Sequence, residues 1–170
     1  MKIFIWRKLE MKKNGFSLIE VLIAVIFIGL AIASLVGANI SFTQANGFGM
    51  DLSTAEFAIE QIKELTAMLP VIDPQSETST FGPESDETDY TYYDDLDDFD
   101  NAIFSPPISA GKEVLNDFAA FSQQITVENV NSTNFEQVVS NHSSRFIRVT
   151  VKVFLNSDEI SSASWIRARY

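Results

Sequence analysis

A single carboxylate interrupts an apolar run near the N-terminus. Glu20 lies five residues after Gly15, and no further charge occurs from Val21 through Met50. Inside the hydrocarbon of a membrane, a carboxylate costs about 3 kcal/mol even on the mildest insertion scale. We therefore expect Glu20 to have a function, with a partner group that neutralises its charge.

A second group of residues suited to chemistry is an acidic run in the middle of the chain. From Glu64 to Gly111 there are twelve acidic residues and no lysine or arginine. Carboxylates this close repel one another unless water solvates them, backbone amides bind them, or a hard cation such as calcium neutralises them. Two hypotheses stay open: a calcium site, and a solvated loop whose aspartates cap short turns. An EF-hand loop is excluded, because Asp100 occupies the position that requires glycine. The candidate calcium ligands are Asp94, Asp95, Asp97, Asp98 and Asp100.

Other residues that support catalysis or nucleic-acid binding are scarce. The chain has no cysteine, one histidine and no recognisable pairing of a nucleophile with a base, so we do not expect an enzyme. The histidine, His142, is expected to be exposed and without a metal or catalytic partner. After residue 15 the chain has seven basic and twenty-two acidic residues, a net charge of −15. Nucleic acid is therefore not an expected partner, because its binding depends on neutralisation of phosphates by lysine and arginine.

The apolar run predicts a helix that crosses a membrane. Thirty uncharged residues follow Glu20, and about 20 suffice to cross a hydrocarbon layer of about 30 Å. Residues 1–15 have a net charge of +4, which places the N-terminus in the cytoplasm and the rest of the chain outside. Translation from Met11 would shorten this basic segment to Met-Lys-Lys-Asn-Gly. An ordinary single-pass anchor is the alternative, but it leaves Glu20 and the junction at Gly15 unexplained.

The elements after the apolar run predict an α+β domain. Apolar residues recur at three- and four-residue steps from Phe48 to Leu69, and Pro70 follows, so we predict one helix from Ser17 to about Leu69. Towards the C-terminus, alternating apolar and polar residues predict antiparallel strands that cover the amphipathic half of this helix. The predicted strands are 122–128, 146–155 and 162–170, with a polar loop at 129–141 and a turn at 156–159.

The ten residues from Gly15 to Ala24, GFSLIEVLIA, resemble the processing and methylation motif of type IV prepilins and type II secretion pseudopilins. This motif is very specific. The resemblance implies that a prepilin peptidase cuts between Gly15 and Phe16 and methylates the new amine of Phe16. It also implies that the Glu20 carboxylate pairs with the Phe16 amine of a neighbouring subunit, a pairing that removes the cost of burying either charge alone. A pair within one subunit, at the i, i+4 spacing, is the alternative.

The resemblance also implies a pilin-like fold: a long N-terminal helix, with a membrane half and an amphipathic half, packed on a small antiparallel sheet. It divides the chain into five parts. These are a leader at 1–15, a transmembrane and polymerisation helix at 16–42, its amphipathic continuation at 43–69, an acidic loop region at 70–118 and a C-terminal antiparallel sheet at 119–170.

The implied function is that of a minor pilin or pseudopilin, a structural subunit in the assembly of a type IV pilus or a related filament. The run Asp-Asp-Leu-Asp-Asp-Phe at 94–99 resembles one found in some minor pilins of the mannose-sensitive haemagglutinin pilus system. The implied partners are the prepilin peptidase, other pilin subunits through the N-terminal helix, and an inner-membrane assembly platform. The implied location is the bacterial inner membrane, with a periplasmic C-terminal domain, and then the filament. The alternatives are a filament-mounted adhesin or cargo-binding module, or a minor pseudopilin of a type II secretion system.

Overall fold

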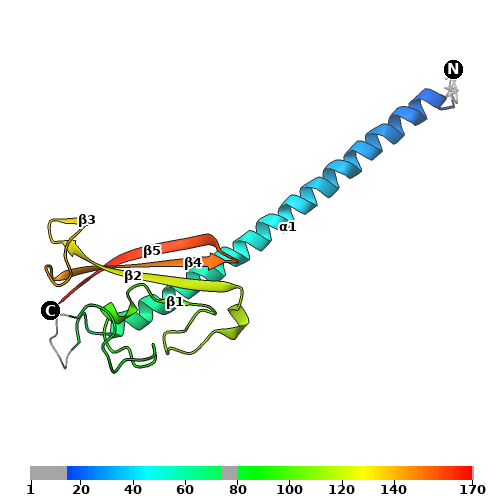
Figure 1. Cartoon of the computed structure of the whole chain (residues 1–170). Coiled ribbons are helices and arrows are strands. Elements are labelled where there is room, and N and C mark those ends of the chain that lie inside the picture. The colour runs from blue at the N-terminus through cyan, green and yellow to red at the C-terminus, as the bar shows by residue number, and fades with distance from the viewer. Residues whose placement is uncertain (1–14, 74–79, 170) are drawn as a thin grey trace, which may run out of the picture. The chain divides into compact units, whose positions relative to one another are not determined.

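A computed structural model of the chain describes residues 15–73 and 80–169 (Figure 1). One long helix and a small antiparallel sheet form an α+β fold, which confirms the predicted fold class. The described residues divide into two compact units between Asn46 and Gly47. The elements in chain order are α1 (Leu18–Met68), the 3-10 helix η1 (Asp97–Phe99), β1 (Ile103–Phe104), the 3-10 helix η2 (Asn116–Phe118), β2 (Phe121–Asn131), β3 (Asn134–Val138), β4 (Phe146–Leu155) and β5 (Asp158–Ala168).

The first unit contains the apolar part of α1. The helix begins at Leu18, one residue after the predicted start, and every described residue up to Asn46 is exposed. By length and composition, this is a helix that could cross a membrane. Its few hydroxyl groups are satisfied within the helix: Ser34, Ser41 and Thr43 each donate a hydrogen bond to the carbonyl four residues earlier. This segment therefore presents an apolar surface with no unpaired hydroxyl, as a membrane requires.

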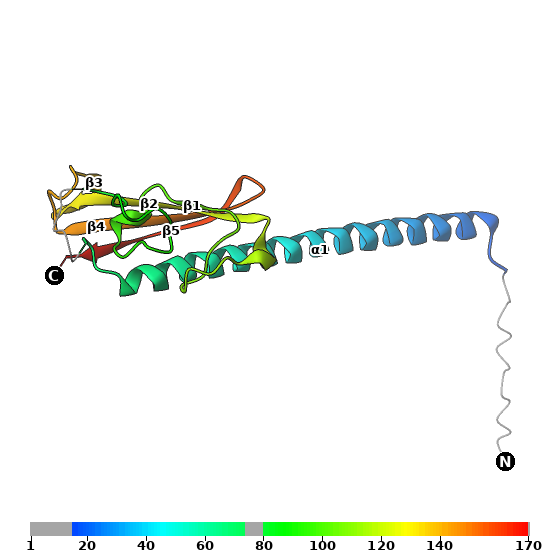
Figure 2. The same cartoon turned by 60° about the horizontal axis from the view of Figure 1, so that its bottom comes forward.

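In the second unit, the C-terminal part of α1 runs along one face of the sheet (Figures 1 and 2). The strand order is β1-β2-β4-β5, all neighbours are antiparallel, and β3 pairs with one end of β2. The buried residues follow the periodicity of each element: every third or fourth residue along the helix, and every second residue along a strand. On α1 the buried residues are Ala55, Ala58, Ile59, Ile62, Leu65 and Thr66. On β2 and β4 the buried apolar residues are Phe121, Ile125, Val127, Val130, Ile147, Val149, Val151 and Val153.

The sheet is larger than the sequence predicts. The segment 129–141, predicted as a loop, contains the end of β2 and all of β3. Every residue of β3 is exposed, so this strand lacks the apolar alternation by which strands are recognised. The final strand begins at Asp158 rather than at residue 162, because the turn occupies only Asn156 and Ser157. Both of these have positive φ angles, 50° and 81°, as a two-residue hairpin turn requires.

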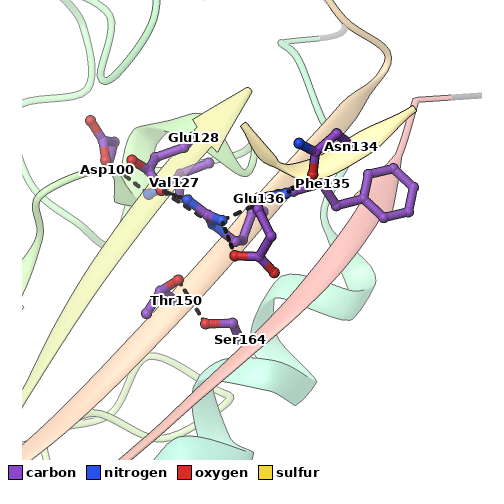
Figure 3. A network of polar contacts seen from close by, with 9 residues as sticks. Asp100, Val127, Glu128, Asn134, Phe135, Glu136, Thr150 and Ser164 are labelled. Carbon is purple, nitrogen blue, oxygen red and sulfur yellow. Dashed lines mark hydrogen bonds and ion pairs between the residues drawn. The ribbon is translucent and has the colours of Figure 1, made fainter. Parts of the chain in front are cut away.

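The other face of the sheet is polar, as the alternation in β4 predicts. Arg148 donates a hydrogen bond to Glu128 on β2 at 2.7 Å and another to the carbonyl of Phe135 on β3 at 3.2 Å (Figure 3). On the same face, the hydroxyls of Thr150 and Ser164 lie 2.9 Å apart (Figure 3). Arg148 thus connects the short strand β3 to the main sheet.

The C-terminal end of α1 is held by the last strand. Arg167 on β5 donates hydrogen bonds to the carbonyls of Thr66 and Leu69, the latter at 3.1 Å. Thr66 is in the last turn of the helix and Leu69 is the residue just after it. Carbonyls at this end have no amide of a following helical turn to accept from, so another donor has to satisfy them. The guanidinium also lies at the negative end of the helix dipole, which favours a cation.

One buried polar side chain connects the helix, the sheet and the intervening loop. Gln123 on β2 is 0% exposed, and its amide nitrogen donates to the carbonyls of Ala58 on α1 at 2.8 Å and Ile108 at 3.2 Å. Its amide oxygen accepts a hydrogen bond from the Ile108 nitrogen at 2.8 Å. Gln123 therefore satisfies the main-chain groups of Ile108, which lies outside the sheet and forms only an isolated bridge with Val114.

Gln123→Leu is expected to lower the free energy of unfolding by about 2–3 kcal/mol, because it leaves the buried Ile108 amide without an acceptor. Gln124→Leu is the matched control, because it changes the same residue type one position along β2, on the polar face of the sheet. It should lower the free energy of unfolding by less than about 0.5 kcal/mol. Urea unfolding of the full chain in detergent, followed by near-UV circular dichroism, measures both. Equal stability of the two variants would contradict this role for Gln123.

Candidate functional site

The predicted cleavage junction lies just before the helix. Gly15 and Phe16 precede the first residue of α1, and the Phe16 side chain is 88% exposed. A Cβ atom added at Gly15 would meet nothing within 4 Å. The peptide bond between these residues therefore lies in accessible, non-helical chain, the form in which a peptidase can bind its substrate.

Glu20 forms a capping box with Ser17 at the start of α1. The Glu20 carboxylate accepts hydrogen bonds from the Ser17 backbone nitrogen at 2.9 Å and from the Ser17 hydroxyl at 3.0 Å. In return, the Glu20 backbone nitrogen donates to the Ser17 hydroxyl at 3.3 Å. This reciprocal pair satisfies two amides at the helix start, and a carboxylate is favoured there by the helix dipole.

The capping box was not predicted, although its signal, Ser-x-x-Glu before an apolar run, is present at 17–20. It gives Glu20 a local role that does not require a partner chain. Pairing of Glu20 with the Phe16 amine stays a prediction, because in the uncut chain the Phe16 nitrogen belongs to a peptide bond.

The acidic loop brings together carboxylates that are distant in sequence. Two overlapping groups have carboxylate oxygens within 4.8 Å of one another, and both groups contain Asp98. We call their five members the carboxylate cluster. They are Glu84, Glu87, Asp94, Asp95 and Asp98.

Of the five predicted calcium ligands, three belong to this cluster and two do not. Asp97 is adjacent in sequence, but its Oδ2 accepts a hydrogen bond from the Gly82 nitrogen at 3.2 Å. Asp100 lies outside the two groups, and its Oδ1 accepts a hydrogen bond from the Val127 nitrogen on β2 at 2.8 Å (Figure 3). Asp100 therefore fixes the loop to the sheet.

Backbone amides of the loop bind the carboxylates of the cluster, as one of the two hypotheses predicts. Asp98 Oδ2 accepts from the nitrogens of Asp94 and Asp95, each at 3.0 Å. Asp95 Oδ1 accepts from the Asp97 nitrogen at 2.9 Å. The two oxygens of Glu87 accept from the nitrogens of Asp94 and Glu84, both at 3.1 Å. The loop is thus folded around its own acidic side chains, of which Asp95 and Asp98 are buried and the other three are at least partly exposed.

Three of the aspartates are buried beside apolar anchors. Asp95, Asp97 and Asp98 are 2%, 3% and 1% exposed, and the intervening Leu96 and the following Phe99 are fully buried. Burial, the largest cause, raises the pKa of Asp95 and Asp98 to about 8 and that of Asp97 to about 6. The charge of Asp97 further raises the pKa of Asp95, and that of Asp95 further raises the pKa of Asp98. The protein environment therefore disfavours negative charge at all three positions.

The hydrogen bonds do not use every buried oxygen. Asp97 Oδ1 and Asp98 Oδ1 are both buried and have no hydrogen-bond partner among the described residues. Lys112 is the cation bonded to this loop, but its ammonium donates to the backbone carbonyls of Thr91 at 3.1 Å and Tyr93 at 2.5 Å. Within the described ranges, no ion pair involves Asp97 or Asp98.

Glu84 and Glu87 were missed by sequence reasoning. They precede the dense acidic run by several residues, and only the folding of the loop places them beside Asp98. The sole sequence signal was the acidic composition of the whole segment. His142 was predicted to be exposed but is half-buried, with its ring at the edge of Phe81, the centroids 5.7 Å apart. It belongs to neither group of carboxylates.

Comparisons with models of known protein families, with curated proteins and with solved structures give no match to this chain.

Proposed function

We propose that this chain is a minor pilin or pseudopilin, a structural subunit of a type IV pilus or a related filament. A prepilin peptidase cuts it between Gly15 and Phe16 and methylates the new amine of Phe16. The N-terminal part of α1 then holds the chain in the inner membrane, from which an assembly platform transfers it into the filament. The acidic domain lies on the periplasmic side, because the basic leader stays in the cytoplasm.

The observation that carries this proposal is one carboxylate at the start of the uncharged part of α1, which is exposed up to Asn46, next to an accessible Gly–Phe bond. A plain anchor needs neither feature. A neutral residue such as glutamine at position 20 could cap the helix equally well, so capping alone does not require a charge. A carboxylate buried in the membrane does gain a strong partner if a nearby cut creates a cationic amine. Leu18 and Ile19, which directly precede Glu20, are 87% and 67% exposed, and Glu20 itself is exposed, so a neighbouring helix has free access to the carboxylate.

The test examines filaments sheared from the bacterium that produces this protein. A tagged copy of the chain is expected in the filament fraction, and its N-terminal residue is expected to be N-methylated Phe16 by mass spectrometry. A chain that stays in the membrane fraction when filaments are removed, with residues 1–15 still attached, would contradict the proposal. A mature chain that begins anywhere other than Phe16 would do the same.

A further inference from the structure

The carboxylate cluster contains more buried negative charge than its hydrogen bonds explain. A buried carboxylate without a cation is strongly disfavoured, and such groups are usually paired, protonated or bound to a metal. Asp98 accepts two amide hydrogen bonds through Oδ2, but Oδ1 of the same group is buried and has no partner among the described residues. The feature to be explained is therefore an unpartnered oxygen, in a side chain only 1% exposed, within a group of acidic side chains.

This oxygen belongs to the residue that both groups of the cluster share. The Asp98 carboxylate has an oxygen within 4.8 Å of oxygens of Glu84 and Glu87 in one group, and of Asp94 and Asp95 in the other. Oδ1 is bonded to the same carbon as Oδ2 and shares this position. Two oxygens that bind one calcium ion at about 2.4 Å are at most about 4.8 Å apart. Each group satisfies this limit, because its oxygens lie within 4.8 Å of one another.

We propose that the carboxylate cluster binds a calcium ion beside Asp98, with Asp98 Oδ1 as a central ligand. Its further carboxylate oxygens come from one of the two groups, either Glu84 and Glu87 or Asp94 and Asp95, because the oxygens within each group lie within 4.8 Å of one another. This site does not depend on the proposed role in a filament, because it lies wholly within the second unit of the chain.

The chemistry of the ligands selects the metal. The two groups contain only carboxylates, and neither includes a histidine or a cysteine, so the donors are hard oxygens. Such a set favours calcium, magnesium or manganese over zinc and copper. Magnesium keeps several of its waters and requires near-ideal octahedral geometry, whereas calcium accepts 6–8 oxygens in flexible arrangements. Asp95 and Asp98 are 2% and 1% exposed, which leaves little room for a hydrated ion and favours calcium.

The alternative is that the cluster stays metal-free and its buried carboxylates are neutral by protonation. Both alternatives are compatible with the amide hydrogen bonds, but they differ in the response to calcium. An ion that binds only the folded chain stabilises it by mass action, and calcium at a hundredfold excess over its dissociation constant should raise the unfolding midpoint by roughly 10 °C. Protonated carboxylates give no such response.

The experiment uses the full chain in detergent micelles, freed of metal with a chelating resin and melted with calcium chloride, with magnesium chloride, or with neither. A calcium-specific rise of roughly 10 °C is expected for the wild type. Asp98→Asn should lose this rise. Its amide oxygen can still accept from Asp94 and Asp95, so without metal it should melt no lower than the wild type. This metal-free melt shows that a lost response is not a lost fold.

Asp158→Asn is the matched control, because it removes an exposed carboxylate at the first residue of β5, far in sequence from the acidic loop. It should respond to calcium as the wild type does. Equal small shifts of the unfolding midpoint with calcium and magnesium in the wild type would overturn the proposal. The cluster would then be a set of protonated carboxylates that cap turns without a metal. A full calcium response in Asp98→Asn would also overturn it, because the ion would then bind elsewhere.

Discussion

Replacement of Gly15 by valine is expected to leave the leader on the chain and to keep the protein out of filaments. In the family that the N-terminal motif resembles, the peptidase requires a small residue before the cut, and valine adds a branched side chain at that position. The structure makes the interpretation simple, because a Cβ at Gly15 meets nothing within 4 Å. A failure to be processed is then a failure of recognition by the peptidase rather than of folding.

The measurement is the intact mass of the protein extracted from membranes, together with its amount in sheared filaments. Gly15→Ala is the matched control, because it adds a side chain at the same position but keeps it small, and it should still be processed. A Gly15→Val chain that is recovered with Phe16 at its N-terminus would show that the motif is not a cleavage site.

Substitution of Glu20 should separate membrane insertion from filament assembly. Glu20→Leu removes a charge from the apolar segment, so it should insert in the membrane at least as well as the wild type. If the carboxylate pairs with the amine of a neighbouring subunit, the same variant should be lost from filaments. The quantity to measure is the ratio of filament-bound to membrane-bound protein.

The capping box provides the control for this experiment. Glu20→Gln keeps an oxygen that can accept hydrogen bonds from Ser17 but removes the charge, and glutamine is accepted at this position of a capping box. Ser17→Ala does the reverse: it keeps the charge and removes the hydroxyl of the box. If charge pairing drives assembly, Glu20→Gln should be lost like Glu20→Leu, and Ser17→Ala should assemble. Normal assembly of Glu20→Gln would reduce the role of Glu20 to helix capping.

The regular elements were predictable where one face of each is buried. The predicted end of the helix at about Leu69 agrees with the observed Met68, because apolar spacing and Pro70 both mark it. Strand β4 agrees with the predicted 146–155 because its inward residues alternate with polar ones. By contrast, β3 has no buried face, and β1 has only two residues, so neither leaves a pattern in the sequence.

The candidate sites were predictable only in part, for a different reason. The acidic run was visible, but which of its members face one another depends on the path of the loop. Asp100 is directed to β2, whereas Glu84 and Glu87, far from the dense part of the run, lie beside Asp98. The capping box is the opposite case, because its signal, a serine followed three residues later by a glutamate, is local and can be recognised in the sequence alone.

The contact between Arg167 and the end of α1 determines when the second unit can fold during synthesis. Arg167 lies about a hundred residues after the carbonyls of Thr66 and Leu69, and β5, to which it belongs, forms the last pair of the sheet. A nascent chain that has emerged only as far as β4 exposes one side of that strand and an uncapped helix end. Because contacts so distant in sequence form late, the domain should complete its fold only after its last residues leave the ribosome. The fold of this unit is therefore completed only once β5 has been synthesised.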